Sequence, residues 1–239
     1  MRSLQIIAIV FALSAVSARG MELSDFVGGR GRNWDAIKVL EQGDAEMRAG
    51  NFQTARRDFD SAIRSDPTLW VAIFWRARLS AGERKWQEVI RDCNEVLRQE
   101  STFVEAAVLR ASANRHLGNY SASLRDLDNV IRLQPVRIEA FAFALDTRAW
   151  IRATCPDPSL RNGKLAITDA TKACNMIKWQ SSGMIDTLAA AYAESGDYDS
   201  AIRYQEKAMN AAGAGQNSRE LQDHMALFKQ HRPVRSSGK

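Results

Sequence analysis

The sequence predicts an all-α protein, a solenoid of about five helical hairpins followed by one capping helix. The first observation is an internal repeat of 34 residues, since the pattern of residues 50–67 returns at 84–101 and again at 118–135. The second is composition: only 5 prolines occur in 239 residues, and the apolar runs are rich in alanine, which favours helix. A fixed period of this length is typical of hairpins that bury their apolar faces against one another.

The first 18 residues have the pattern of a secretory signal peptide. Arg2 gives a basic start, an apolar run of 13 residues covers 4–16, and cleavage is expected after Ala18, with Gly20 as the alternative. The run is shorter than the roughly 20 apolar residues that span a bilayer. We expect an exported protein, periplasmic or secreted, with no integral membrane segment after signal removal. An uncleaved membrane anchor and a misassigned start are the alternatives.

Charge and the leader segment give no indication of nucleic acid as a partner. Residues 19–33 contain glycine and arginine, and we expect a flexible leader there in preference to an RNA-binding segment. The net charge of +5 falls to +4 when Arg2 leaves with the signal, and this balance is only mildly basic.

The chain has 3 cysteines, and an odd number in an exported protein leaves at least one free thiol. Cys93 falls at a repeat position that is apolar elsewhere, so we expect it to be a small buried hydrophobe. A helix from Gly163 to Cys174 spans roughly 16 Å. Because a disulfide needs Cα atoms within about 7 Å, no bond between Cys155 and Cys174 is expected.

The expected organisation follows the repeat along the chain. In the first repeat, Asn33 caps a helix over 34–49, and a second helix over 52–65 stops before Pro67. The next two hairpins are expected at 69–99 and 103–133. The full assignment is signal peptide 1–18, leader 19–33, solenoid 34–216 with repeats at 36–69, 70–103, 104–137, 138–181 and 182–215, capping helix 217–231 and a basic disordered tail 232–239.

The fourth repeat departs from the others, and the capping helix follows the fifth. The first helix of the fourth repeat, at 138–154, is longer than its counterparts. In the loop that follows, Pro156 and Pro158 are expected to exclude helix. Asn162-Gly163 suits a left-handed turn. The capping helix is expected to place three apolar residues on one face: Leu221, Met225 and Phe228.

This pattern resembles the tetratricopeptide repeat. The shared features are a small residue in the middle of each first helix (Gly43, Ala77, Ala111), an aromatic residue at the start of each second helix (Phe52, Trp86, Tyr120) and a closing proline in two of the first three repeats. The stretch 149–208, with its Ala-Thr-Cys-Pro-Asp-Pro and Asp-Thr-Leu-Ala-Ala-Ala-Tyr-Ala-Glu segments, is similar to a C-terminal module of bacterial tetratricopeptide proteins. The resemblance implies a right-handed superhelix, an interaction module and a bacterial source.

The resemblance also implies a concave groove lined by the first helix of each hairpin. Transferring the family register gives the partner-binding residues Leu40, Asp44, Met47, Arg48, Phe74, Arg78, Val108, Ser112, Arg115, His116 and Trp150, with Asp146 in the ambiguous fourth repeat and Asp186 and Ala190 in the fifth. This lining is apolar with scattered arginine, which suits a peptide segment with apolar and acidic features. Packing of these residues against the next repeat is the alternative.

No pattern of catalytic or metal-binding residues stands out in the sequence. Zinc-protease, paired-cysteine, phosphate-loop and nucleophile-elbow motifs are missing, and His224 and His231 have no neighbouring cysteine or acidic ligand motif. We therefore expect no enzyme, no cofactor and no metal, but a monomeric or weakly associating module that binds a protein or peptide. An assembly subunit of a cell-envelope complex is the second hypothesis, and an enzyme or accessory hydrolase subunit is the third.

Overall fold

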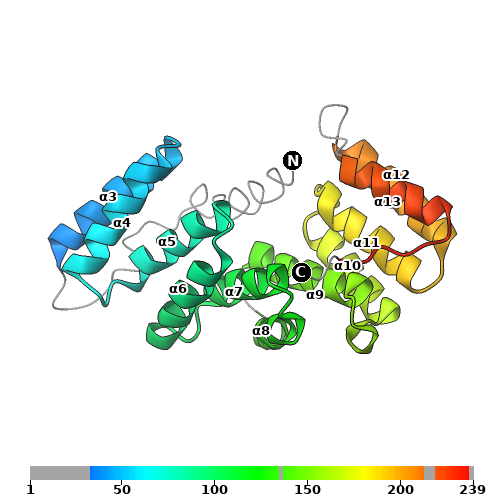
Figure 1. Cartoon of the computed structure of the whole chain (residues 1–239), viewed down its shortest axis with the longest axis horizontal. Helices are drawn as coiled ribbons and strands as arrows, with labels where there is room; N and C mark the ends of the chain where they lie inside the picture. Colours follow the sequence, from blue (N-terminus) through cyan, green and yellow to red (C-terminus); the bar gives the residue numbers. More distant parts are fainter. Residues whose placement is uncertain (1–32, 135–136, 213–218, 237–239) are drawn as a thin grey trace. The chain divides into compact units, whose positions relative to one another are not determined.

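The computed structural model describes residues 33–134, 137–212 and 219–236, and all regular structure within them is helical (Figure 1). This confirms the predicted all-α solenoid class. The predicted signal peptide 1–18 and most of the leader lie outside the described residues. The chain divides into two compact units, one ending at Ala113 and one beginning at Asn114.

Unit 1 consists of stacked helical hairpins. Its helices are α3 (Trp34–Arg48), α4 (Phe52–Ser65), α5 (Trp70–Gly82), α6 (Trp86–Gln99) and most of α7 (Val104–His116). One face of α5 joins α3 and α4 in an apolar cluster around Phe59. The other face of α5 joins α6 and α7 in a second cluster around Val89 and Cys93. Each hairpin therefore buries its apolar surface against its neighbour, as the repeat requires.

The turns inside the hairpins explain the glycine of the repeat. Gly50, Gly118 and Gly196 have φ of 83°, 78° and 86°, a left-handed conformation that costs glycine little. Arg84 holds the same place in the second hairpin with a φ of 59°. A residue with a Cβ atom pays roughly 1–2 kcal/mol in this conformation, so the second turn depends on packing of α5 against α6.

Unit 2 continues the pattern with α8 (Tyr120–Leu133), α9 (Ile138–Thr154), α10 (Gly163–Met176), α11 (Ser182–Glu194), α12 (Tyr198–Ala212) and α13 (Arg219–Lys229). Its core is rich in alanine. Ala149, Ala170, Ala189 and Ala201 are fully buried and come from four successive helices. Small side chains let these helices approach closely, and Phe228 of α13 completes the same cluster.

The loop after α9 differs from the sequence prediction in two ways. Pro158 begins a short 3₁₀ helix, Pro158–Leu160, where we expected no helix, because proline is tolerated at the first position of a helical turn. Asn162 has φ −159° and is not in a left-handed turn. Its side chain instead accepts a hydrogen bond from the Leu165 N–H at 3.0 Å and caps α10.

The C-terminal segment also differs from its prediction, since residues 232–236 are ordered against unit 2. Val234 is buried in the alanine-rich cluster. The Ser236 N–H donates to the Thr154 carbonyl at 2.8 Å, and the Arg235 guanidinium lies 2.7 Å from Glu194. The prediction of a disordered tail is wrong here, because the end of α9 offers carbonyl acceptors and α11 offers a carboxylate. Residues 237–239 lie outside the description.

Replacement of Gly163 by alanine tests the close approach of α10 to α11. A Cβ atom at Gly163 would lie 2.8 Å from the backbone nitrogen of Ser195, which cannot move without shifting the end of α11. We expect Gly163→Ala to lower the free energy of unfolding by about 1–3 kcal/mol in urea titrations.

Gly82→Ala is the matched control, because a Cβ atom there meets nothing within 4 Å at the end of α5. It should leave stability unchanged or raise it by up to ~1 kcal/mol. Equal effects of the two replacements would contradict the close contact at Gly163.

Candidate protein-interaction site

Several predicted groove residues of unit 1 are buried in the structure. Leu40 is fully buried in the cluster around Phe59. Phe74 packs edge-on against Phe103, with ring centroids 4.8 Å apart. Val108 and Ser112 are buried as well. In the structure these residues stabilise unit 1, and their contact with a partner stays a prediction.

Asp44 of α3 and Arg78 of α5 are buried charged residues that interact electrostatically. Their exposed fractions are 4% and 2%. The Arg78 guanidinium lies over the Trp75 ring, 4.2 Å from its centroid, and Asp44 also makes an ion pair with Arg48. Burial lowers the pKa of Arg78 to about 10, and the charge of Asp44 offsets part of this fall. Both charges are thus engaged within the protein.

The remaining predicted residues reach the surface. Arg48 is exposed, and Met47 and Trp150 are partly exposed. Arg115 and His116 are also partly exposed at the end of α7, where Arg115 Nη2 lies 3.1 Å from His116 Nε2. Arginine and tryptophan are the residue types that most often anchor protein partners, so these positions are suited to recognition.

In unit 2 the end of α7 and the helices α9 and α11 share a polar surface that we call the unit 2 face, made of Arg115, Asp146, Trp150 and Asp186. The carboxyl group of Asp146 is only partly satisfied by its neighbours. Its Oδ1 atom is shielded from solvent and has no hydrogen-bond partner, while Thr187 hydrogen-bonds the carboxyl group. Burial raises the pKa of Asp146 to about 7, and Thr187 and Arg115 offset only part of the rise.

Helix α13 lies on this face through His224. The imidazole Nδ1 is 2.8 Å from Asp186 Oδ1, and both residues are buried, with exposed fractions of 7% and 2%. The ring also lies 5.8 Å from the Trp150 ring, centroid to centroid. His224 is therefore a buried partner of α11, and the sequence analysis, which found no acidic residue for it, missed this role.

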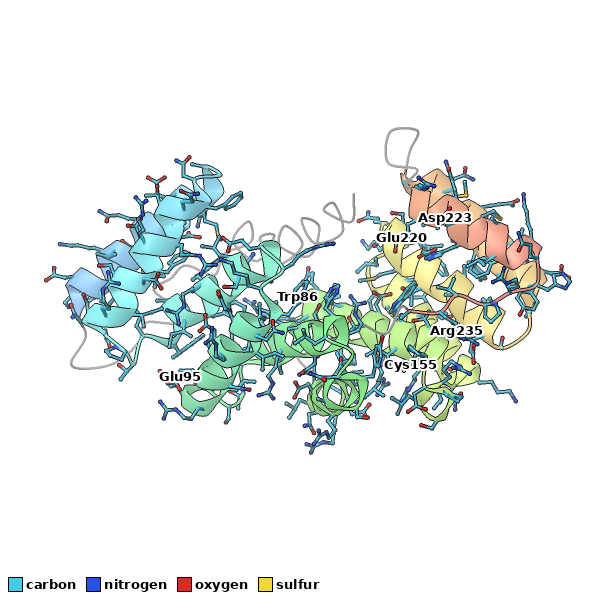
Figure 2. The ribbon with its side chains drawn as sticks, viewed as in Figure 1. Trp86, Glu95, Cys155, Glu220, Asp223 and Arg235 are labelled. Carbon is cyan, nitrogen blue, oxygen red and sulfur yellow. The ribbon has the colours of Figure 1, made fainter. Side chains whose placement is uncertain are left out.

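Charges around the imidazole favour its protonated form. Burial lowers the pKa of His224, but the hydrogen bond and charge of Asp186 outweigh it, so the pKa lies above the ordinary value of 6.5. Glu220 and Asp223, the α13 carboxylates labelled in Figure 2, act in the same direction. The charge of Glu220 also raises the pKa of Arg115 against the lowering effect of burial, so the first turn of α13 lies within electrostatic reach of the end of α7.

Further contacts of α13 cover the place expected to be an open groove in the fifth repeat. Phe228 is fully buried in the cluster that contains Ala190, and Leu221 and Met225 are buried too, as their shared face predicted. Gln205 of α12 donates to the Leu221 carbonyl at 3.0 Å. In Figure 1, α13 runs beside α12. Asp186 and Ala190, expected to line the groove, are thus covered by the chain itself.

A signal for this arrangement is present in the sequence. One groove-side position, the fifth residue of the family's first helix, is apolar in the first three repeats, as Leu40, Phe74 and Val108. It becomes aspartate in the last two repeats, as Asp146 and Asp186. A histidine, His224, stands within the apolar face of the capping helix. Two carboxylates and one base on surfaces that must meet indicate a buried polar contact.

The described part of the chain holds no group of three His, Cys, Asp or Glu residues that could bind a metal ion. Within the same ranges no helix has the length and apolar character that crossing a membrane requires.

Comparisons with known proteins relate these helical hairpins to tetratricopeptide repeat proteins. The tetratricopeptide repeat model matches residues 184–214, which cover most of α11 and all of α12. No curated protein matches the chain. Among solved structures, MamA is 19% identical with a TM-score of 0.57, covering 74% of this chain and 91% of its own.

Two further structures share the fold. YrrB, described as a tetratricopeptide protein with an unusual peptide-binding site, is 14% identical with a TM-score of 0.58, covering 80% of this chain and 91% of its own. A tetratricopeptide repeat protein from Parabacteroides merdae is 18% identical with a TM-score of 0.60, covering 84% and 82%. At these identities the comparisons establish the fold: hairpins of the tetratricopeptide type, one of which matches the family model.

The raised pKa of Asp146 predicts a pH dependence of stability. Because the folded state holds a proton up to about pH 7 that the unfolded state releases near 3.8, stability falls as the pH rises between these values. Asp146→Asn removes this loss. Between about pH 5 and about pH 8, we expect the unfolding free energy of the variant to gain roughly 2 kcal/mol relative to wild type.

Urea titrations at several pH values measure this gain. Asp199→Asn, an exposed change on α12, is the control and should track wild type. A constant difference between Asp146→Asn and wild type across the range would contradict the buried carboxyl group.

Proposed function

We propose that the protein is an exported interaction module, or scaffold, that binds a peptide segment of a partner protein through the groove-side faces of its first helices. The observation that carries this proposal is the seating of α13 on the unit 2 face. That face holds a protein segment by apolar burial of Phe228 and by a specific charged contact between His224 and Asp186. A surface that combines these two contact types suits recognition of amphipathic segments.

Exposed residues of each unit supply anchors for a partner. Arg115, His116 and Trp150 are partly exposed in unit 2, and Arg48 is exposed in unit 1. Arginine can hold a carboxylate through two parallel hydrogen bonds. YrrB shares the fold and has a peptide-binding site, which supports the same use of the fold here.

Export and source are parts of the proposal that depend on the first 18 residues and on the sequence resemblance. A basic start, a short apolar run and small residues favour cleavage and release into the periplasm or the medium of a bacterium. The mild charge of the mature chain favours a protein partner over nucleic acid, and a monomer or weak self-association is proposed.

An assembly subunit of a cell-envelope complex is the second candidate. Trp34 and Phe52 favour it, since their exposed fractions of 64% and 51% are high for large apolar side chains. Assembly through disulfides fits less well, because the thiols of Cys93, Cys155 and Cys174 are buried and are not joined in a disulfide in the described structure. Burial raises the pKa of Cys174 to about 12, which keeps that thiol protonated and unreactive.

Site-specific photo-crosslinking in cells tests the module. A photoreactive residue replaces Arg48, His116 or Trp150, which are accessible, and Arg57 on the exposed side of α4 is the control. We expect one protein to be captured from the groove-side positions and not from Arg57. Capture mainly from Arg57, or only of a second copy of the chain, would contradict the module and favour the assembly role.

A further inference from the structure

Helix α13 is held on the unit 2 face by contacts that resemble those of a bound ligand. Its 11 residues are too few to form a stable helix alone in water, so its helical state depends on docking. Leu221, His224, Met225 and Phe228 follow the spacing by which an amphipathic helix fills a groove. The face therefore selects a helix with a base between apolar anchors.

With α13 docked, two buried hydrogen-bond acceptors of unit 2 have no donor. Asp146 Oδ1 is buried without a hydrogen-bond partner on α9, one turn before Trp150, which touches His224. Gln205 donates to the carbonyl of Leu221, yet its own Oε1 atom is buried without a partner. Each buried acceptor without a donor is costly. A helix that brings donors to these atoms would bind this face better than α13 does.

The charges around these acceptors indicate which kind of hydrogen-bond donor a ligand should bring. Asp146 and Asp186 stand on neighbouring helices, and their charges act on one another. His224 Nδ1 lies 2.8 Å from Asp186 Oδ1 and 3.1 Å from Asp186 Oδ2. Arg115 acts on Asp146 from α7 and also feels Glu220 of α13. Helix α13 thus supplies His224 to Asp186, while Asp146 is influenced by Arg115 of α7. A longer, permanently charged side chain at the place of His224 is expected to interact with both aspartates.

We propose that α13 is an intramolecular occupant of a helix-binding site on the unit 2 face, and that the site's exchangeable ligand is an amphipathic helix of a partner protein with a lysine or arginine between its apolar anchors. This inference rests on the proposed function and specifies its partner. In the unbound protein α13 covers the apolar surface, and the partner helix replaces it when the partner is present.

Peptides with the sequence of residues 219–230 serve as probes of the full chain. One has the native sequence, one carries His224→Lys and one carries His224→Glu, each with fluorescein. Binding is measured by anisotropy, and opening of α13 by hydrogen exchange of the amides of α13 in the chain. The receptors are the wild-type chain and a chain with His224→Ala, which weakens docking of α13 while leaving Phe228 in place.

We expect the lysine peptide to bind the His224→Ala chain at least about tenfold more tightly than it binds wild type, because less docking must be displaced. It should also bind at least about tenfold more tightly than the native peptide, since it gains charge-assisted contacts with the aspartates. The glutamate peptide should not compete. Binding should remove the exchange protection of α13.

Two control chains keep these outcomes specific. His231→Ala changes an exposed histidine that stacks on Tyr198, and it should bind all peptides as wild type does. Asp186→Asn should reduce the preference for the lysine peptide. Circular dichroism of each chain confirms that it is folded before binding is compared.

Equal binding of the three peptides, binding that leaves α13 protected, or no binding to the His224→Ala chain would each overturn the inference. The proposed function fails by a different result. If crosslinking captures a partner from Arg48 or His116 while no peptide displaces α13, the module stands and its ligand lies elsewhere. If peptides displace α13 but no partner is captured in cells, the site is a helix site without the proposed role.

Discussion

The hydrogen bond between His224 and Asp186 connects the end of the chain to the surface on which the functional account depends. It brings α13 across α11 and against Trp150 of α9, and it keeps a charged pair in a place that water does not reach. Removing either partner leaves the other buried and uncompensated, which is the most expensive state for a polar group. The seating of α13 over the alanine-rich core depends on this contact together with the burial of Phe228.

The interaction is possible because the hairpins of unit 2 pack closely. Alanine at 149, 170, 189 and 201 leaves little space between successive helices, so polar residues at the groove-side positions of neighbouring helices come close together. Asp146, Asp186 and Thr187 lie within each other's influence for that reason. The same closeness at Gly163 leaves no room for a side chain beside Ser195. In a solenoid that packs this tightly, polar residues on the groove sides of different helices act on one another electrostatically.

Much of the fold could be predicted from the sequence, because the repeat specifies both helices and turns. The period locates Gly50 and Gly118, and both adopt the left-handed conformation that a hairpin turn requires. The site was less predictable. Periodicity assigns a side to Leu40 or Phe74, but it cannot say whether a neighbouring helix covers that side. His224 was missed because its partner Asp186 is 38 residues away, and only the docked position of α13 brings them together. The ordered segment 232–236 depends on carbonyl acceptors at Ala153 and Thr154, which no side-chain pattern reveals.

Titration of His224 by NMR, in the full chain and in an Asp186→Asn variant, shows directly whether α13 is docked on Asp186. The account predicts a pKa above 6.5 in the wild-type chain, because Asp186 outweighs the effect of burial. In the variant the pKa should fall, since the hydrogen bond and charge of Asp186 are lost and only Glu220 and Asp223 still oppose the effect of burial. A His224 that titrates at its ordinary value in both chains would show that α13 is not docked on Asp186.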